Sequence, residues 1–354
     1  SRILKYKEEG LESDIFVLKE GTKVVYREYE GSRIISGGKE ALSTILTSNS
    51  HSTILVHFLD SHMWDVLKGN LEDRKVLIWV HGSEIQPWHR RTFNYETEEE
   101  LDKAKIESSK RMEFWRPLLN DLPSNVKLIF VSKYFAGEVM EDTGVNIPLN
   151  KYEIIHNPID TEQFNYIRKN PEQRLKLLTI RPFASHKYAN DLTVKAILKL
   201  SKTKEFNNIQ IMIVGDGKLF DQTLKPLHKF ENITIHRGFL SHAQIGDLHK
   251  EYGVFLTPTR MDSQGVSRDE AMSSGLVPIT TSVTAIPEFV DSESGILVPG
   301  EDYKAMADAI IRLVNDPVLF DKLSSGAAER VRQQSRSQKI ISAEIKLITS
   351  EELE

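Results

Sequence analysis

The sequence predicts an α/β protein of two domains, each built on a parallel β-sheet that is covered by helices. Short apolar runs alternate along the chain with longer amphipathic stretches, which is typical of strands joined by helices. The chain has 354 residues, of which 40% are hydrophobic and 27% are charged. It can therefore bury a large core, and it exceeds the usual size of one domain.

The apolar runs that have the length and composition of buried strands fall into two groups, enough for two sheets. They lie at 14–18, 23–29, 53–59, 76–81, 127–131, 153–156, 175–180, 210–214, 234–237, 254–257, 277–281 and 295–298. Residues 95–119 have apolar positions at helical spacing among many charged residues, so we expect a long and partly exposed helix there. The pattern of 328–353 also indicates a helix.

The boundary between the domains is expected just before Asn157-Pro158, a pair that blocks helices and favours turns. We therefore predict domains at 1–155 and 156–335, followed by a C-terminal helix at 336–354. Residues 1–10 have the pattern of a helix that ends at Gly10, whereas a Rossmann-like domain begins with a strand and a tight turn. We expect that strand and its glycine-rich loop to precede residue 1.

Composition argues against several classes of function. A net charge of −5 disfavours nucleic acid as the main partner, because binding to a phosphate backbone needs a basic face. Apolar stretches stay well below the roughly 18 to 20 residues of a membrane span. The chain has no cysteine, which excludes disulfides and thiolate metal sites within it, and we expect a cytoplasmic protein.

The most informative run is T-P-T-R-M-D-S-Q-G-V-S-R-D-E-A-M-S-S-G-L-V-P-I-T-T-S-V-T-A-I-P-E at 257–288. It indicates the end of a buried strand, a polar turn with Gly265, a helix carrying Glu270 and a second strand. A helix that begins at the carboxyl end of a strand directs unpaired amides toward bound anions. Asp262 and Glu270 are expected to face the same crevice, where carboxylates accept hydrogen bonds from sugar hydroxyls. The alternatives are an N-cap role for Asp262 and a surface position for Glu270.

Two further segments follow predicted strands. R-P-F-A-S-H-K follows the strand at 175–180 and places Arg181 and Lys187 at the mouth of the second sheet. H-G-S-E follows the strand at 76–81 and places His81 and Gly82 at the carboxyl end of a strand in the first sheet. A surface position for the two cations, and a structural role for the histidine, are the alternatives.

The run at 257–288 resembles the acidic-x7-acidic signature of glycosyltransferase family 4. The family comprises retaining enzymes of the GT-B fold, in which two Rossmann-like domains face each other across a cleft and bind nucleotide-sugar donors. The sequence departs from the signature at Asp262, where the family usually has glutamate. Arg181 and Lys187 match the family's Arg-x5-Lys pair, which grips the donor pyrophosphate.

The resemblance also implies roles for the other site residues. Asp262 and His81 would contact the donor sugar, and Glu270 would bind the ribose. Backbone groups of a further set would approach the donor: Gly215, Gly238, Phe239, Gly265, Val266 and Ser267. For Phe239, core packing is the alternative. Apart from the resemblance, an aromatic ring beside basic groups would either grip an acceptor glycan or a lipid-linked phosphate or pack at an interface, and such a run is formed by Trp88, His89, Arg90 and Arg91.

The resemblance implies front-face transfer with retention of configuration. It also implies a reaction without a metal or other cofactor, and a UDP-sugar is the favoured donor. The acceptor would be a glycan or a lipid-linked glycan of bacterial surface polysaccharide, such as O-antigen or capsule, made at the inner face of the membrane. The C-terminal helix would return to the first domain. Rival functions are another GT-B enzyme, such as an epimerase or a phosphorylase, and a catalytically silent nucleotide-sugar-binding protein. A dehydrogenase is disfavoured because neither I-V-G-D-G nor I-S-G-G-K completes a Gly-x-Gly-x-x-Gly turn.

Overall fold

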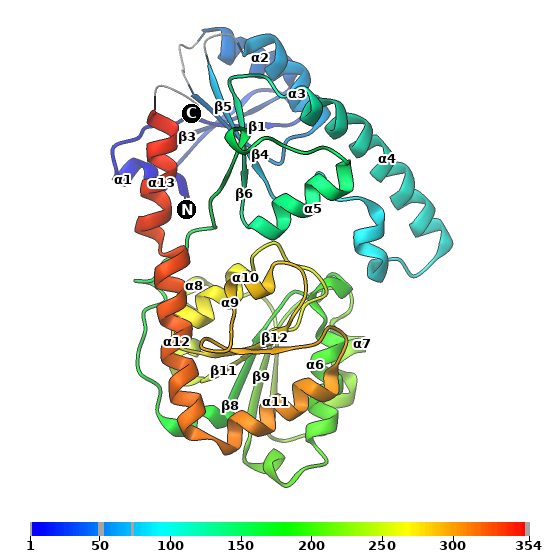
Figure 1. The fold of residues 1–354 in the computed structure, drawn as a ribbon, viewed down its shortest axis with the longest axis vertical. Coiled ribbons are helices and arrows are strands. Elements are labelled where there is room, and N and C mark those ends of the chain that lie inside the picture. The colour runs from blue at the N-terminus through cyan, green and yellow to red at the C-terminus, as the bar shows by residue number, and fades with distance from the viewer. Residues whose placement is uncertain (1, 49–52, 72–73, 351–354) are drawn as a thin grey trace. The chain divides into compact units, whose positions relative to one another are not determined.

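The computed structural model describes residues 2–48, 53–71 and 74–350, and the chain divides into two compact units (Figure 1). The first unit consists of residues 1–90, 97–158 and 338–354, and the second of residues 91–96 and 159–337. The chain therefore changes unit after 90, 96, 158 and 337, whereas the sequence placed divisions only after 155 and 335.

The first unit contains a parallel sheet with the strand order β4-β5-β6-β7. Its strands are Thr53–His57, Lys75–Val80, Val126–Phe130 and Tyr152–Ile154. The two central strands are almost wholly buried, because helices and loops cover both faces of the sheet. The helices of this part are α2 Lys39–Ser48, α3 Ser61–Leu67, α4 Glu98–Asn120 and α5 Lys133–Thr143.

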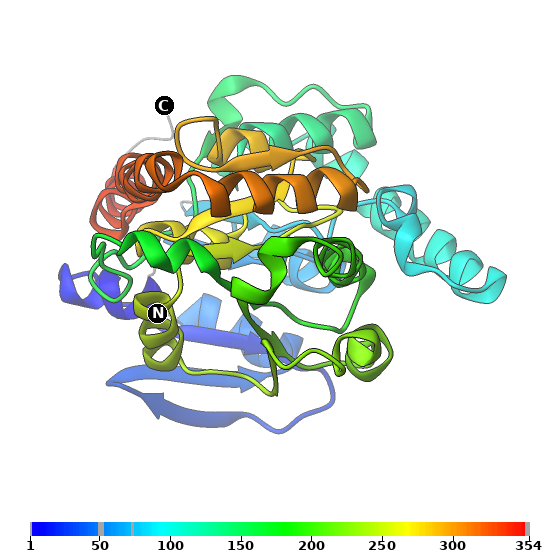
Figure 2. The same ribbon diagram turned by 90° about the horizontal axis from the view of Figure 1, so that it is seen from below.

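A smaller sheet of the first unit has the order β1-β3-β2 (Figure 2), with strands Ile15–Leu18, Ser32–Gly37 and Val25–Tyr29. Strands β2 and β3 form an antiparallel hairpin, and β3 is missing from the predicted strands. The Glu30-Gly31 pair, which forms the turn between β2 and β3, could have indicated this hairpin from sequence. Both residues have positive φ, 49° and 72°, as a two-residue hairpin turn requires.

The C-terminal helix α13, Ser337–Thr349, packs within the first unit against α1, Arg2–Glu8. Its apolar side chains share a core cluster with Tyr6 and Trp79. The fully buried carboxylate of Glu344 accepts hydrogen bonds from the Tyr6 hydroxyl at 2.7 Å and from Arg2 Nε at 3.0 Å. Both bonds go to Oε2, so they offset part of the cost of burying this carboxylate.

The second unit is built on a parallel sheet with the order β10-β9-β8-β11-β12-β13 (Figure 1). In chain order, its strands are Lys176–Ile180, Gln210–Gly215, Ile233–Arg237, Val254–Leu256, Val277–Thr281 and Ile296–Val298. This is the doubly wound order 3-2-1-4-5-6, and the strand order reverses between β8 and β11. Ligands of such sheets bind outside the carboxyl ends of the strands at that reversal.

Helices cover both faces of this sheet. One face packs against α6 Asn190–Leu200, α7 Phe220–Leu224 and α11 Tyr303–Asn315. The other packs against α8 His242–Glu251 and α9 Val266–Ser273. The remaining helices are α10 Ile286–Phe289 and α12 Pro317–Ser335. Side-chain caps fix several helix starts, such as Asp302 at α11 and the Ser241 capping box at α8.

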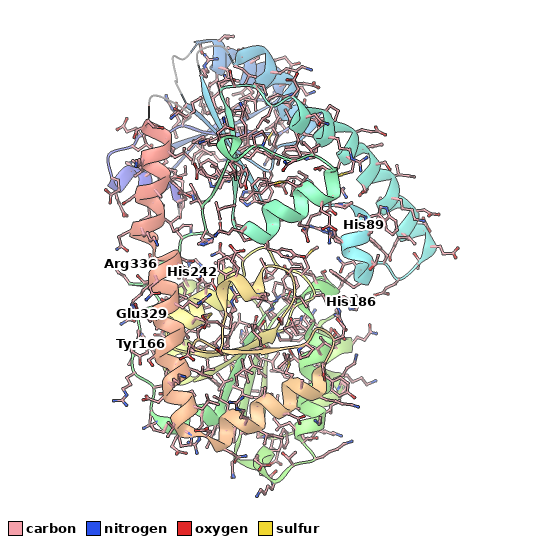
Figure 3. The ribbon with its side chains drawn as sticks, viewed as in Figure 1. His89, Tyr166, His186, His242, Glu329 and Arg336 are labelled. Atoms are coloured by element: carbon pink, nitrogen blue, oxygen red, sulfur yellow. The ribbon has the colours of Figure 1, made fainter. Side chains whose placement is uncertain are left out.

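All the predicted strands are present, with ends that differ by one or two residues, and the long helix expected at 95–119 is α4. The helical pattern of 328–353 is split at Arg336, labelled in Figure 3, where the backbone leaves the helical region. Ile159 lies beside this break: its N–H donates to Ser335 O, and its carbonyl accepts from Ser337 N. Residues 351–354 lie outside the described part of the chain.

The contact between α1 and α13 generates a stability prediction. Tyr6→Phe should lower the free energy of unfolding by about 1–3 kcal/mol, because it deprives a buried carboxylate of a hydrogen bond. Urea unfolding measures the change. Tyr26→Phe is the control, since that ring is 68% exposed. Equal stability of Tyr6→Phe and wild type would show that the bond to Glu344 contributes nothing to the fold.

Candidate active site

The loops that follow β8 and β11 meet at the strand-order reversal of the second sheet. The first loop carries Arg181 and Lys187, together with His186, which is labelled in Figure 3. The second loop begins at Thr257 and ends at Gly265. Lys187 O accepts hydrogen bonds from Arg260 N at 2.9 Å and from Thr259 Oγ1 at 3.0 Å, so the two loops are tied together.

The structure brings the two predicted cations to one aromatic ring. Arg181 Cζ lies 5.0 Å from the centre of the Tyr188 ring, and Lys187 Nζ lies 5.9 Å from the same centre. Both distances are within the range of cation–π attraction. The Arg181 guanidinium also donates from Nη2 to Pro258 O at 3.3 Å.

Burial disfavours the charged forms of both cations. It lowers the pKa of Arg181 and of Lys187, and the nearby Asp262 carboxylate opposes the shift in each case. Arg181 is 6% exposed, and its Nε has no hydrogen-bond partner among the described residues. A buried donor without a partner is costly. The pair is therefore a site where an anion would relieve an existing electrostatic penalty.

Asp262 lies in the loop after β11, and its backbone is fixed by Thr284. Thr284 Oγ1 donates to Asp262 O at 2.9 Å and accepts from Asp262 N at 3.0 Å. Gly265 occupies the N-cap position of α9, and no side chain caps that helix. The N-cap alternative for Asp262 is therefore wrong.

A buried polar network that the sequence analysis missed supports the turn at Gly265. The fully buried Arg268 pairs with Asp269 at 2.6 Å and donates to Gln264 O at 2.6 Å, while Gln264 Nε2 donates to Asp269 Oδ2 at 3.1 Å. Gly265 has φ of +100°, and a Cβ there would lie 2.8 Å from Arg268 Nη1. Only glycine fits this turn without displacing the arginine. Val266 and Ser267 form the first turn of α9 directly after it.

Glu270 lies one turn into α9 and is partly buried, which excludes the surface alternative. Burial, and after it the neighbouring Asp269 carboxylate, raise the pKa of Glu270 to about 7. The side chain can therefore exchange a proton near neutral pH, where it could accept hydrogen bonds as a carboxylate or donate one as an acid.

The loops after β9 and β10 extend the site along the sheet. A Cβ on Gly215 would lie 2.0 Å from Arg181 O, so the strand ends can approach this closely only with glycine at that position. Gly238 N donates to Gly215 O at 3.0 Å, which joins the loop after β10 to the end of β9. The side chain of Phe239 is 81% exposed, so core packing is excluded for it.

His81 lies in the first unit, where it follows β5. The backbone N–H groups of His81 and Gly82 donate to the Glu84 carboxylate at 2.5 Å and 3.0 Å, which fixes the turn. The His81 ring is half-buried and stacks on Phe58, with 4.2 Å between the ring centres.

The basic run at 88–91 is partly occupied by ion pairs. Arg90 Nε lies 2.9 Å from Asp142 Oδ1, and Arg90 Nη2 lies 2.7 Å from Glu141 Oε2. His89 Nε2, labelled in Figure 3, lies 3.4 Å from Asp142 Oδ1. These contacts favour packing over acceptor binding for Arg90 and His89. Arg91 belongs to the second unit.

Two general features bear on cofactors and membranes. In the described part of the chain, no three His, Cys, Asp or Glu side chains gather in a way that could hold a metal ion. Nor do the described helices include one that is both long and apolar enough to cross a membrane.

Several residues of the site were missed from sequence: Tyr188, Gln264, Arg268 and Asp269. Gln264, Arg268 and Asp269 lie on either side of the predicted donor-binding residues 265–267. A polar run of this kind indicates only a solvent-exposed helix start, so nothing in the sequence indicated that these side chains are buried. Tyr188 is adjacent to Lys187 and was detectable as an aromatic neighbour of a predicted cation.

The chain is similar to known glycosyltransferases. Residues 174–316 match the model of the family described as Glycosyl transferases group 1. Over 137 residues, 38% of this chain and 35% of the relative, it is 31% identical to N-acetyl-alpha-D-glucosaminyl L-malate synthase of Bacillus anthracis. Over 91 residues, 25% of this chain and 24% of the relative, it is 34% identical to the capsular polysaccharide biosynthesis glycosyltransferase CapM of Staphylococcus aureus. The matches thus span about a third or less of these curated relatives.

Solved structures show the fold. Sucrose-phosphate synthase of Thermosynechococcus elongatus aligns over 98% of this chain and 90% of its own, with a TM-score of 0.76 and 16% identity. Anabaena HepE in complex with UDP-glucose aligns over 88% and 81%, with a TM-score of 0.66 and 13% identity. These likenesses confirm the GT-B prediction, in which two Rossmann-like domains share one chain.

The environment of Glu270 generates a pH prediction. The folded state holds the proton of Glu270 up to about pH 7, whereas in the unfolded chain the group ionises near pH 4.3. Its contribution to stability is therefore full below about pH 4 and is lost as pH rises through 7. The loss amounts to on the order of 3 kcal/mol.

Glu270→Gln should remove this dependence, so its stability relative to wild type should rise between pH 5 and pH 8 in urea unfolding. Glu231→Gln, at an exposed position of the same unit, is the control and should keep the wild-type slope. Parallel pH profiles for Glu270→Gln and wild type would contradict the raised pKa.

Proposed function

We propose that this chain, whose residues 174–316 match the Glycosyl transferases group 1 family model, transfers a sugar from a nucleoside-diphosphate donor to a glycan or lipid-linked acceptor. The relatives named above include a capsular polysaccharide glycosyltransferase, and another is a lipopolysaccharide core mannosyltransferase of Rhizobium meliloti. We therefore place the reaction in the synthesis of a bacterial surface polysaccharide such as O-antigen or capsule. It would take place in the cytoplasm, at the inner face of the membrane.

The observation that carries the proposal is the pair of buried cations at the strand-order reversal. Transfer leaves a nucleoside diphosphate whose charge must be stabilised as the glycosidic bond breaks, and such stabilisation is usually the largest catalytic term. Arg181 offers a planar fork for phosphate oxygens, and Lys187 offers a compact charge. Arg181 is buried and Lys187 is partly buried, so an arriving diphosphate would not need to displace a full hydration shell from either side chain.

The other residues take roles around that diphosphate. Asp262, which acts electrostatically on both cations, would accept hydrogen bonds from the sugar, and Glu270 would bind the ribose. The amides that follow Gly265 belong to the start of a helix, where the backbone favours anions. The resemblance assigns His81, in the first unit, to the transferred sugar.

We assign a retaining, front-face mechanism. The acceptor hydroxyl attacks the anomeric carbon on the side from which the diphosphate leaves, and a phosphate oxygen of the leaving group takes the hydroxyl proton. This route needs no carboxylate nucleophile. The two side-chain cations supply the charge that a metal ion supplies in other transferases, so we propose a reaction without metal.

A UDP-sugar is the favoured donor. The solved structures similar to this chain include HepE with UDP-glucose and Staphylococcus aureus TarM with UDP. The rival function is that of a catalytically silent protein that binds a nucleotide sugar. It is favoured by one observation: Asp262 has a shorter side chain than the family's glutamate. Turnover separates the two functions, and an epimerase would convert the donor without any acceptor.

A thermal-shift screen of UDP-, GDP- and dTDP-hexoses, together with UDP and uridine, tests donor binding. UDP should raise the melting temperature more than uridine does, because only the diphosphate reaches Arg181 and Lys187. At a concentration one hundred times Kd, the stabilisation would be about 2.7 kcal/mol. Equal shifts with UDP and uridine would mean that the cations do not hold the diphosphate.

Substitution of a cation tests catalysis. Lys187→Ala should reduce turnover of the donor found in the screen by about 10²- to 10³-fold, because it removes charge that faces the leaving group. Lys202→Ala, at an exposed position of the same unit, is the matched control and should retain wild-type rates. Both assays are run with EDTA. An unchanged rate in Lys187→Ala would refute the site, and loss of wild-type activity in EDTA would refute the metal-free mechanism.

A further inference from the structure

Two histidines of the first unit meet at the carboxyl ends of neighbouring parallel strands. His57 ends β4, and His81 follows β5; the register pairs His57 with Trp79. His57 Nδ1 and His81 Nε2 lie 2.9 Å apart, which is the distance of a hydrogen bond. The sequence analysis identified His81 and missed its partner.

Aromatic contacts hold both rings in place. The His57 ring stacks on Trp79 at 5.0 Å and on His81 at 5.2 Å, with interplanar angles of 22° and 28°. The His81 ring stacks on Phe58 at 4.2 Å with an angle of 22°. Phe58 has a φ of 56°, a backbone conformation that non-glycine residues rarely adopt. The strand end is therefore shaped so that an aromatic ring covers His81.

Both imidazoles are neutral at neutral pH. Burial, followed by the nearby Arg2 guanidinium, lowers the pKa of His57 to about 3 and that of His81 to about 4. A hydrogen bond between two neutral imidazoles needs an N–H on one ring and a bare nitrogen on the other. The bond therefore couples the tautomers of the two residues.

Two arrangements satisfy the bond. If His57 donates from Nδ1, both rings carry their hydrogen on Nδ1. If His81 donates from Nε2, both rings carry it on Nε2, which is the tautomer that neutral histidine intrinsically prefers. The second arrangement leaves Nδ1 of His81 bare. No described residue donates a hydrogen bond to that nitrogen.

We propose that His57 is a positioning residue that holds His81 as its Nε2–H tautomer, so that Nδ1 of His81 accepts a hydrogen bond from a hydroxyl of the bound sugar. The inference rests on the proposed function, because that function assigns His81 to the sugar. In this arrangement His81 accepts a hydrogen bond from a sugar hydroxyl and does not donate one to a sugar oxygen.

NMR of protein labelled with ¹⁵N-histidine tests the tautomer without any ligand. We expect a proton on His81 Nε2, a nitrogen–nitrogen coupling from it to His57 Nδ1, and an unprotonated Nδ1 on His81. His57→Asn should preserve this state, because its side-chain oxygen can accept from Nε2–H. His57→Phe should give an averaged tautomer and a rapidly exchanging proton. A proton on His57 Nδ1, or a His81 spectrum that is unchanged in His57→Phe, would overturn the proposal.

Turnover of the donor found in the UDP-, GDP- and dTDP-hexose screen gives the functional test. His57→Phe should lower kcat by roughly 10- to 100-fold, by analogy with the loss of groups that orient a functional histidine. His57→Asn should restore most of the rate, and His62→Asn, on the exposed surface of α3, should have none of these effects. Thermal melting checks that each variant is folded.

The two hypotheses fail differently. Wild-type turnover in His57→Phe, together with an inactive His81→Ala, would overturn the positioning role and leave the proposed function standing. Wild-type turnover in His81→Ala would remove the sugar assignment, and with it the catalytic consequence of the pair, even if the spectra show the expected tautomer.

Discussion

Burial of two positive charges at the carboxyl ends of parallel strands is the constraint on which the second unit's site depends. Arg181 and Lys187 emerge beside β11, where the strand order reverses, and Asp262 only partly offsets the cost of their desolvation. Such a cost persists when the surrounding structure determines the geometry strongly. Here the geometry is set by the ties between loops and by the close approach of Gly215 to Arg181.

A second layer of buried polar groups supports this arrangement. Arg268, Asp269 and Gln264 hydrogen-bond to one another beneath the Gly265 turn and leave room only for a glycine beside the guanidinium. Removing one partner of such a network strands the others without hydrogen bonds, so it acts as a unit. The network fixes the start of α9, and through it the positions of Glu270 and of the amides that precede it.

The strands, the long helix and the two cations could be predicted from the sequence because each has a recognisable local pattern. A buried strand is a continuous apolar run, and Arg181 and Lys187 have a fixed spacing after one. Strand β3 was missed because its pairing depends on a two-residue turn. His57 and Tyr188 were missed because their roles depend on residues that parallel strand pairing and loop contacts bring close to them. Such contacts leave no periodic pattern in the sequence.

Binding of a diphosphate to Arg181 and Lys187 should change the protonation equilibrium of Lys187, which can be measured. An NMR titration of the Lys187 ε-methylene, assigned by comparison with Lys187→Arg, would give its pKa with and without UDP. We expect the pKa of Lys187 in the free protein to lie below that of ordinary lysines, because burial disfavours the ammonium, and to rise clearly when UDP binds. An ordinary pKa in the free protein that UDP leaves unchanged would contradict this expectation.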